Sequence, residues 1–149
     1  MEEVSEEQIE ELDKLWHKVI QYYQSNEQGG FTGRLEGVTT VEVSILNMVA
    51  KRPDVIMREI SKGLDIPSST LTSAVDRLEE RGFLKRVISQ RDRRSFGLEL
   101  TEEGVLAQNE HKKQEQELFK KMLTALDSEE ERVTFINLAY KIVAEFIDD

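Results

Sequence analysis

The chain has 149 residues, of which 38% are hydrophobic and 34% are charged, and its formal net charge is −10. It contains no cysteine, which excludes disulfides, thiolate metal ligands and thiol-based redox chemistry. No apolar run approaches the roughly 18 residues that span a bilayer, and the acidic start MEEVSEEQIEE is unlike a signal peptide. We therefore expect a single soluble domain over residues 1–149, cytoplasmic and without a membrane partner.

The charge is distributed unevenly along the chain. Residues 51–95 hold eleven lysines or arginines against seven acidic residues, a local balance of +4, whereas the rest of the chain carries −14. A basic segment inside an acidic chain is typical of a protein that offers one face to a polyanion and repels polyanions elsewhere. Nucleic acid is therefore a candidate partner despite a pI near 4.8.

A long helix is predicted at the start of the chain. Ser5 and Gln8 fit a capping box, in which the side chain of each residue hydrogen-bonds the backbone of the other. Apolar residues then recur every three or four positions, as on one face of a helix: Ile9, Leu12, Trp16, Val19 and Tyr23. The helix is expected to run to about residue 28, where a glycine pair ends it and a loop follows as far as residue 37.

A second helix is predicted from Thr39, which forms another capping box with Glu42. Val38 and Val43 have the spacing of a hydrophobic staple around this helix start. The helix is expected to stop before Pro53, because a proline disfavours helical geometry in the residue that precedes it. Its inward-facing residues are predicted to be Ile45, Leu46 and Val49.

Two closely spaced helices are predicted next. The first, MREISKGL, ends near Gly63, and its inward side is Ile60 and Leu64. Pro67 suits the first turn of the second helix, whose apolar stripe is Leu71, Val75 and Leu78. Gly82 is placed to be the left-handed residue after this helix, which lets Phe83 pack back on Leu78.

A small antiparallel hairpin is predicted from FLKRVI and SFGLEL, which are rich in β-branched and aromatic residues. Phe96, Leu98 and Leu100 alternate with polar or small residues, as in a half-buried strand. The arginine-rich sequence between the two segments would form the tip of the hairpin.

Two further helices are predicted beyond the hairpin. Thr101 starts one that extends to about Leu126, and its acidic first turn suits the helix dipole. This helix is polar in its middle and apolar at both ends, which is typical of a helix that bridges two packed regions. Ser128 with Glu131 is a third capping box, and it opens a last helix with apolar residues at Val133, Ile136, Tyr140, Val143 and Ile147.

The order of helix, tight turn, longer helix and hairpin is that of a winged helix-turn-helix, whose second helix can enter the major groove of DNA. The polar side of that helix carries small hydroxyl residues and one long cation, and its N-terminal amides suit a phosphate. Its candidate DNA-binding residues are Ser68, Ser69, Thr70, Thr72, Ser73 and Arg77, with Asp76 beside them. At the hairpin tip, Arg91, Arg93 and Arg94 are expected to reach the flanking minor groove. We expect Asp92 to orient a neighbouring arginine by a charge-assisted hydrogen bond.

The stretch STLTSAVDRLEERGFLKR, followed by RDRRSFGLELTEEG, resembles the MarR family of winged-helix transcriptional regulators, and the pattern of elements extends this resemblance over nearly the whole chain. The resemblance implies a mainly α fold, with a winged helix-turn-helix core over residues 38–100 and dimerisation helices over residues 1–30 and 101–149. It implies a homodimer that binds a pseudo-palindromic operator, as a repressor rather than an activator. It also implies a small-molecule effector, commonly aromatic, that lowers DNA affinity. By position, the DNA-facing residues of the family are matched by Ser68, Ser69, Thr72, Ser73 and Arg77 and by Arg91, Asp92, Arg93 and Arg94. Ser89 replaces an acidic residue of many relatives.

Other functions have less support in the sequence. His17 and His111 are isolated histidines, more often exposed or capping than metal ligands, although Glu110 and Glu115 lie near His111, so we expect no metal and no cofactor. An enzyme is not expected, because no phosphate-cradling glycine loop or nucleophile motif is present. The aromatic or soft residues Trp16, Tyr22, Tyr23, Phe31 and Met48 are core residues by default, so no ligand contact is assigned. The main alternative is a winged-helix adaptor that binds a protein partner and no DNA.

Overall fold

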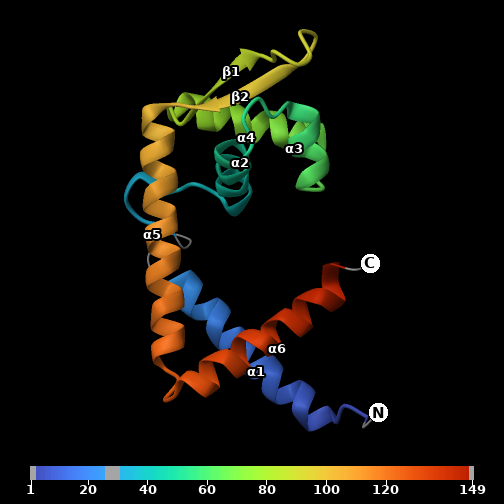
Figure 1. The fold of residues 1–149 in the computed structure, drawn as a ribbon, viewed down its shortest axis with the longest axis vertical. Coiled ribbons are helices and arrows are strands. Elements are labelled where there is room, and N and C mark those ends of the chain that lie inside the picture. Colours follow the sequence, from blue (N-terminus) through green and yellow to red (C-terminus); the bar gives the residue numbers. More distant parts are fainter. Residues whose placement is uncertain (1–2, 26–30, 148–149) are drawn as a thin grey trace. The chain divides into compact units, whose positions relative to one another are not determined.

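The computed structural model describes residues 3–25 and 31–147. In these residues, six α-helices, one short 3₁₀ helix and two strands follow one another (Figure 1). The chain separates into two compact units, Met1–His111 and Lys112–Asp149. The mainly α-helical fold with a two-stranded hairpin is confirmed, and it is the architecture of a winged helix-turn-helix.

Helix α1 (Glu6–Ser25) begins at the predicted capping box. The Gln8 amide donates to Ser5 Oγ at 3.2 Å, and the Ser5 amide donates to Gln8 Oε1 at 3.0 Å. The predicted end of this helix lies outside the described residues. Its apolar side chains are more than half exposed at Ile9, Leu12, Trp16 and Val19.

Helix α2 (Thr40–Lys51) also starts as predicted. Thr39 is its N-cap, and the Thr39 amide donates to Glu42 Oε2 at 2.7 Å while the Glu42 amide donates to Thr39 Oγ1 at 3.2 Å. Val38 and Val43, the predicted staple, are both buried. The helix ends at Lys51, and its C-cap Arg52 has an extended backbone before Pro53, so the proline sets this boundary.

Helices α3 (Met57–Gly63) and α4 (Ser68–Glu80) form the predicted helix-turn-helix, with Pro67 as the N-cap of α4. Gly82 has a φ of 74°, as predicted for a left-handed residue after the helix. The Gly82 amide donates to the Glu79 carbonyl and the Phe83 amide to the Leu78 carbonyl, which together make a Schellman motif. This motif turns the chain directly from α4 into the hairpin.

Strands β1 (Leu84–Ile88) and β2 (Phe96–Leu100) pair antiparallel, with Leu84 opposite Leu100 and Ile88 opposite Phe96. We call the two strands and their connecting loop the wing. Leu98 is buried as the alternation predicts, whereas Phe96 is 57% exposed, because this end of the wing extends beyond the core.

A third extended segment, which the sequence did not reveal, lies along the other edge of β2. The Leu98 amide donates to the Val55 carbonyl at 3.1 Å, and Ile56 forms an isolated bridge with Gly97. The hairpin is therefore hydrogen-bonded to the segment between α2 and α3.

The hydrophobic core of the first unit collects the inward faces of α2, α3, α4 and the wing. The predicted inward residues Ile45, Leu46, Ile60, Leu71, Val75 and Leu78 are all at most 1% exposed. Leu35, from the 3₁₀ helix η1 (Gly33–Leu35), and Ala107 are also fully buried in this core.

Helix α5 (Glu102–Thr124) begins after Thr101, whose Oγ1 accepts a hydrogen bond from the Gly104 amide at 3.0 Å. The helix ends two residues before the predicted Leu126, and the boundary between the two compact units falls within it, after His111.

Helix α6 (Glu129–Ile147) follows. Its predicted capping box is half formed: Ser128 Oγ accepts from the Glu131 amide, but the Glu131 carboxylate accepts from the Asp127 amide. Along the described segments, no helix combines the length and apolar character needed to cross a membrane.

Candidate nucleic-acid interface

Helix α4 presents one polar face opposite its buried stripe. Over its first ten residues, the exposed positions are Ser68, Ser69, Thr70, Thr72, Ser73, Asp76 and Arg77. The Thr72 hydroxyl donates to the Ser68 carbonyl at 2.8 Å and the Ser73 hydroxyl to the Ser69 carbonyl at 3.1 Å. The hydroxyl protons are thus used within the helix while their oxygens can still accept hydrogen bonds. The predicted groove-facing residues therefore share one exposed surface of small side chains.

Arg77 is bound to a carboxylate that the sequence did not assign to it. Its Nε donates to Glu42 Oε1 at 2.6 Å, and the Glu42 side chain is only 3% exposed. Burial favours a higher pKa for Glu42, but hydrogen bonds from Thr39 and Arg77 outweigh it, so that this pKa lies below its ordinary value. In the described residues, no protein acceptor is recorded for the Nη groups of Arg77. The same guanidinium can thus neutralise a buried acid and donate to a ligand.

Arg86 of β1 holds the base of the wing against α4. Its Nη2 lies 2.6 Å from Asp76 Oδ1, its Nη1 pairs with the Glu79 carboxylate, and its backbone amide donates to Glu79 Oε1 at 2.9 Å. Asp76, which the sequence placed on the polar face of the helix, is thus an ion-pair partner of the wing. Neither Arg86 nor Glu79 was singled out from the sequence, because their contact depends on the path of the chain after Gly82.

Asp92 shapes the wing tip, which we define as residues 89–95. Its Oδ1 accepts from the Arg94 amide at 3.1 Å and its Oδ2 from the Ser95 hydroxyl at 2.6 Å. The Ser95 hydrogen bond is the main cause of a lowered pKa for Asp92, and Arg58 of α3 adds a Coulombic contribution. We expected Asp92 to hold an arginine side chain; in the described residues, its recorded hydrogen bonds instead close the turn.

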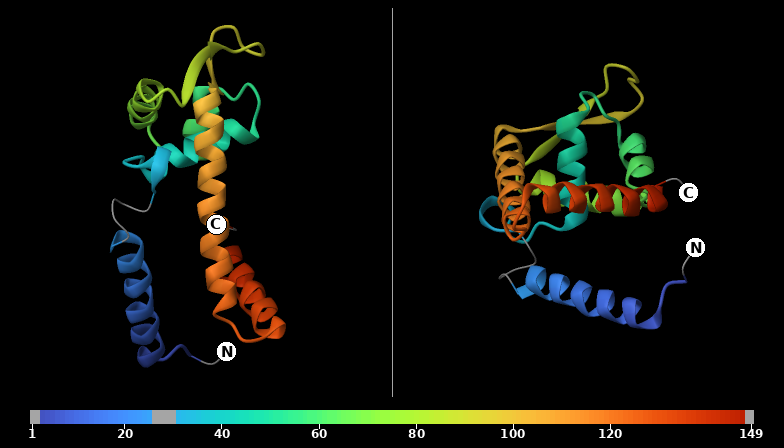
Figure 2. Two further views of the ribbon diagram at one scale, coloured as in Figure 1. Left: turned by 90° about the vertical axis from the view of Figure 1, so that its left-hand side faces the viewer. Right: turned by 60° about the horizontal axis from the view of Figure 1, so that its bottom comes forward.

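Arg93 and Arg94 are exposed, and no ion pair is recorded for either with another described residue. The loop that carries them projects at one edge of the helical core in both views of Figure 2. Arg91 is also exposed, but it lies against Glu59 and Asp54. The three arginines of the wing tip therefore divide into two with free charge and one with acidic partners.

Ser89 is fully buried at the start of the wing tip. Its hydroxyl donates to Asp54 Oδ2 at 3.1 Å and accepts from the amides of Arg91 and Asp92, both at 3.2 Å. Asp54 has a positive φ of 55°, a left-handed conformation in which aspartate is enriched among non-glycine residues. The carboxylate that binds Ser89 is thus that of Asp54, 35 residues earlier in the chain.

The two histidines lie in different surroundings. His17 is exposed, and its ring nitrogen is 2.9 Å from the Asp13 carbonyl oxygen. His111 is 9% exposed, contrary to the expectation of an exposed or capping residue, and meets Phe31 edge to face with 5.4 Å between ring centres. Within residues 3–25 and 31–147, no three histidine or carboxylate side chains are grouped to hold a metal ion.

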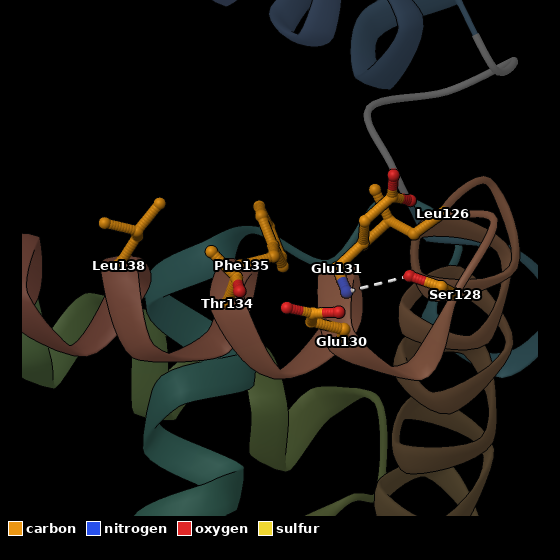
Figure 3. A pocket seen from close by; sticks show the side chains of 7 residues that line it. All are labelled: Leu126, Ser128, Glu130, Glu131, Thr134, Phe135 and Leu138. Atoms are coloured by element: carbon orange, nitrogen blue, oxygen red, sulfur yellow. Dashed lines mark hydrogen bonds between the residues drawn. The ribbon is translucent and has the colours of Figure 1, made fainter.

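A shallow pocket of about 480 Å³ lies at the start of α6. Figure 3 shows its apolar side chains, Leu126, Phe135 and Leu138, on one side of the helix, beside the hydrogen bond from the Glu131 amide to Ser128. Tyr23 lies outside the residues whose side chains are described, and none of the other aromatic or soft residues noted in the sequence lines this pocket. Of those residues, Trp16 and Tyr22 are exposed, and Phe31 and Met48 pack at the edge of the core.

Comparison with known proteins agrees with this architecture. Residues 36–95 match the family model described as MarR family. The chain is 27% identical over 132 residues to the uncharacterized HTH-type transcriptional regulator YwhA of Bacillus subtilis (strain 168), covering 89% of this chain and 94% of that protein. It is 32% identical over 69 residues to the HTH-type transcriptional repressor MdtR of the same organism, covering 46% of this chain and 44% of MdtR. The crystal structure of Streptococcus pneumoniae FabT in complex with DNA is similar with a TM-score of 0.74 at 28% identity, covering 94% of each chain.

Proposed function

We propose that the chain is a winged helix-turn-helix transcriptional regulator of the MarR family, whose model matches residues 36–95, and that it binds double-stranded DNA as a homodimeric, ligand-responsive repressor. In this proposal, residues 38–100 bind DNA, and residues 1–30 and 101–149 pair with a second copy. The similarity to FabT, solved in complex with DNA, supports the choice of partner.

The observation that carries the proposal is the exposed cations of the wing beside a polar helix face. The whole chain is acidic, with a net charge of −10. Yet Arg93 and Arg94 are exposed without a recorded acidic partner among the described residues. Like-charge repulsion disfavours DNA binding over most of the surface, so the wing and α4 are where a duplex would meet least repulsion. The hydroxyl residues and Arg77 of α4 are then the proposed readers of the major groove.

A salt titration of DNA binding tests this assignment. We expect the Arg93→Ala, Arg94→Ala double variant to bind selected duplexes more weakly and to reduce the slope of log affinity against log salt by about 0.9 for each lost phosphate contact. The matched control is Lys112→Ala, Lys113→Ala, which removes the same charge from exposed positions of α5. The control is expected to keep the wild-type slope.

The adaptor alternative gives opposite results. A winged-helix adaptor would not shift duplex DNA even at low salt, and the arginine and lysine double variants would behave alike. Sequencing the DNA fragments that the purified protein selects from a random pool would then show no enriched motif.

Exposed apolar faces support the homodimer. In α1, Ile9, Leu12 and Trp16 are each 58% to 67% exposed, and in α6, Val133 and Tyr140 are 51% and 72% exposed. Helices that expose several large apolar side chains commonly make protein contacts. A second copy supplies an identical surface, as two-fold assemblies require.

The repressor and effector parts of the proposal rest on the family and on the similarity to the repressor MdtR. A dimer reads two half-sites about 34 Å apart, so a ligand that changes this spacing lowers affinity. Repression is tested by placing a selected site at a reporter promoter, where the protein should reduce expression. A panel of phenolic and other aromatic compounds should then contain one that weakens binding in vitro; a panel without effect contradicts the ligand-responsive part alone.

A further inference from the structure

Each nitrogen of the Arg91 guanidinium lies near a protein oxygen, although the side chain is 56% exposed. Its Nη1 and Nη2 donate to the two carboxylate oxygens of Glu59, at 3.3 Å and 2.7 Å. Nη2 also donates to the Asp54 carbonyl at 2.8 Å, and Nε lies 3.4 Å from Asp54 Oδ2. The two-pronged contact with Glu59 is the arginine–carboxylate geometry that combines strength with orientation.

The partners of Arg91 are themselves fixed in the fold. Glu59 Oε2 accepts from the Ile56 amide at 3.1 Å, which caps the start of α3. Asp54 Oδ2 accepts from the Arg91 amide at 3.1 Å, in addition to the hydroxyl of the buried Ser89. The side chain and the backbone of Arg91 are therefore both attached to residues 54–59.

Residues 54–59 also hold the other strand of the wing. The Val55 carbonyl accepts from the Leu98 amide, and Ile56 bridges Gly97. A Cβ atom at Gly97 would lie 3.2 Å from Asp54 Oδ1, so the segment is packed closely on β2. One segment thus contacts the wing in β2 and again at its tip, and Arg91 makes the contact at the tip.

The charges around Arg91 argue against a direct contact with DNA. Arg91 has two acidic partners, Glu59 and Asp54, whereas Arg93 and Arg94 have no such partners recorded among the described residues. A phosphate that approached Arg91 would meet the carboxylates of Glu59 and Asp54 within its pairing distance, and their repulsion costs electrostatic energy. The sequence alone could not separate the three arginines, because Glu59 precedes Arg91 by 32 residues.

We propose that Arg91 is a positioning residue, which holds the wing tip against α3 and so presents Arg93 and Arg94 to the duplex without itself binding phosphate. The inference rests on the proposed DNA-binding function and refines its site. If the wing tip is released from α3, only a fraction of the molecules hold the wing in the conformation that binds DNA. The apparent DNA affinity then falls in proportion to that fraction.

Single substitutions at Arg91 and Arg94 test this role, with DNA affinity and salt slope measured together. Arg91→Ala is expected to weaken binding, by about tenfold if the competent fraction falls to one tenth, with an unchanged salt slope. Arg94→Ala is expected to lower the slope by about 1.8, because each copy of the homodimer loses one phosphate contact worth about 0.9. Arg91→Lys should bind as weakly as Arg91→Ala, because lysine cannot form the two-pronged contact, whereas Arg94→Lys should keep most of the wild-type slope. A reduced slope in Arg91→Ala that Arg91→Lys restores would overturn the proposal.

Glu59→Gln separates a positioning role of Arg91 from direct DNA contact, because the two roles predict opposite changes in DNA affinity. The glutamine carbonyl can still accept from the Ile56 amide, but the negative charge beside the wing is gone. If Arg91 touches DNA, this variant frees a cation and removes repulsion, so affinity rises. If Arg91 positions the wing, affinity falls, and adding Arg91→Ala causes little further loss because the two residues act as one unit.

Hydrogen exchange of the intact protein without DNA separates this inference from the proposed function. Arg91→Ala is expected to speed exchange of the amides of residues 89–95, while Arg93→Ala leaves them unchanged, at equal melting temperatures. Equal exchange in wild type and Arg91→Ala would refute the positioning role. If the wild type bound no duplex at low salt but Arg91→Ala still speeded exchange, the proposed function would fail and the attachment of the wing tip would stand.

Discussion

Glu42 has two separate tasks within the first unit. Its carboxylate caps the start of α2 through Thr39 and accepts a hydrogen bond from Arg77 of α4. Isolated buried carboxylates are costly, and this one is tolerated because each oxygen has a donor. The helix start and a candidate base reader therefore depend on the same side chain.

The pH dependence of the free energy of unfolding should reveal how much the charge of Glu42 stabilises the fold. Because the folded-state pKa of Glu42 is lowered from 4.5, its charge stabilises the fold at higher pH, and this contribution is lost as pH falls through the lowered value. Glu42→Gln is expected to cost about 1 kcal/mol at pH 7, a figure discounted because the Arg77 side chain is 54% exposed. Urea unfolding from pH 3 to pH 7 should show this cost shrinking toward the acid end. A cost that is constant with pH would show that the charge is unimportant.

Substitutions at two exposed positions of α4 should change which DNA bases the protein prefers. Arg77→Ala and Thr72→Ala are expected to alter which sequences are selected from a random pool, because a lost base contact changes discrimination by about 1 to 3 kcal/mol at one position. Arg93→Ala is the contrasting variant, expected to weaken all sequences alike. If the selected motif were identical in wild type and both α4 variants, those residues would not be readers of the groove.

At the residue scale, the sequence predicted which side chains are exposed better than it predicted which side chains form ion pairs. Periodicity assigned the buried and exposed positions of α4, because a helix repeats every 3.6 residues. It could not predict that Arg77 meets Glu42 or that Arg91 meets Glu59, since each pair is more than 30 residues apart and depends on how α2, α3 and the wing pack. The DNA-binding roles of the individual residues remain predictions.

Two glycines define how α4, the wing and α5 join. Gly82 is left-handed, but a Cβ atom there would meet nothing within 4 Å. Gly104 has the opposite constraint, because a Cβ atom would lie 1.8 Å from the Phe83 carbonyl oxygen. The first turn of α5 is thus in direct contact with the backbone that enters β1.

Alanine substitutions should separate these two constraints. Gly82→Ala is expected to cost about 1 kcal/mol, since only the left-handed backbone is strained. Gly104→Ala gains at most about 1 kcal/mol of helix propensity but should lose about 2 to 3 kcal/mol by overpacking against a backbone atom, so its net cost is the larger. Chemical unfolding of both variants checks the order, and a Gly104→Ala protein as stable as wild type would contradict the close packing.

At the element scale, the boundaries that carry local signals were predicted closely. Capping boxes, Pro53 and Gly82 act within a few residues of the backbone that they shape, so they are readable from the chain itself. The extended segment at Val55 was missed because its hydrogen bonds go to β2, more than 40 residues later. The exposure of Phe96 was missed for a similar reason, since alternation identifies a strand face but not where the core ends.

The whole molecule offers apolar surface at positions that a monomer would normally cover. We expect sedimentation equilibrium to find dimers of the wild type at micromolar concentration. Leu12→Asp and Ile136→Asp should shift them toward monomers, because a buried unpaired charge opposes association. Ile88→Asp is the matched control, as Ile88 is 68% exposed on the wing and outside the proposed dimer region. A monomeric wild type, or equal dissociation in all three variants, would rule out pairing through α1 and α6.

The shared use of Glu42 limits how the DNA preference of this protein can be redesigned. A new side chain at position 77 without a positive charge would leave a carboxylate that is 3% exposed without its cation. A change of operator that replaces Arg77 is therefore best made with residues 42 and 77 exchanged together, because a library that varies α4 alone would leave Glu42 without its cation in most members. The same reasoning leads us to expect that natural changes at these two positions arise as pairs.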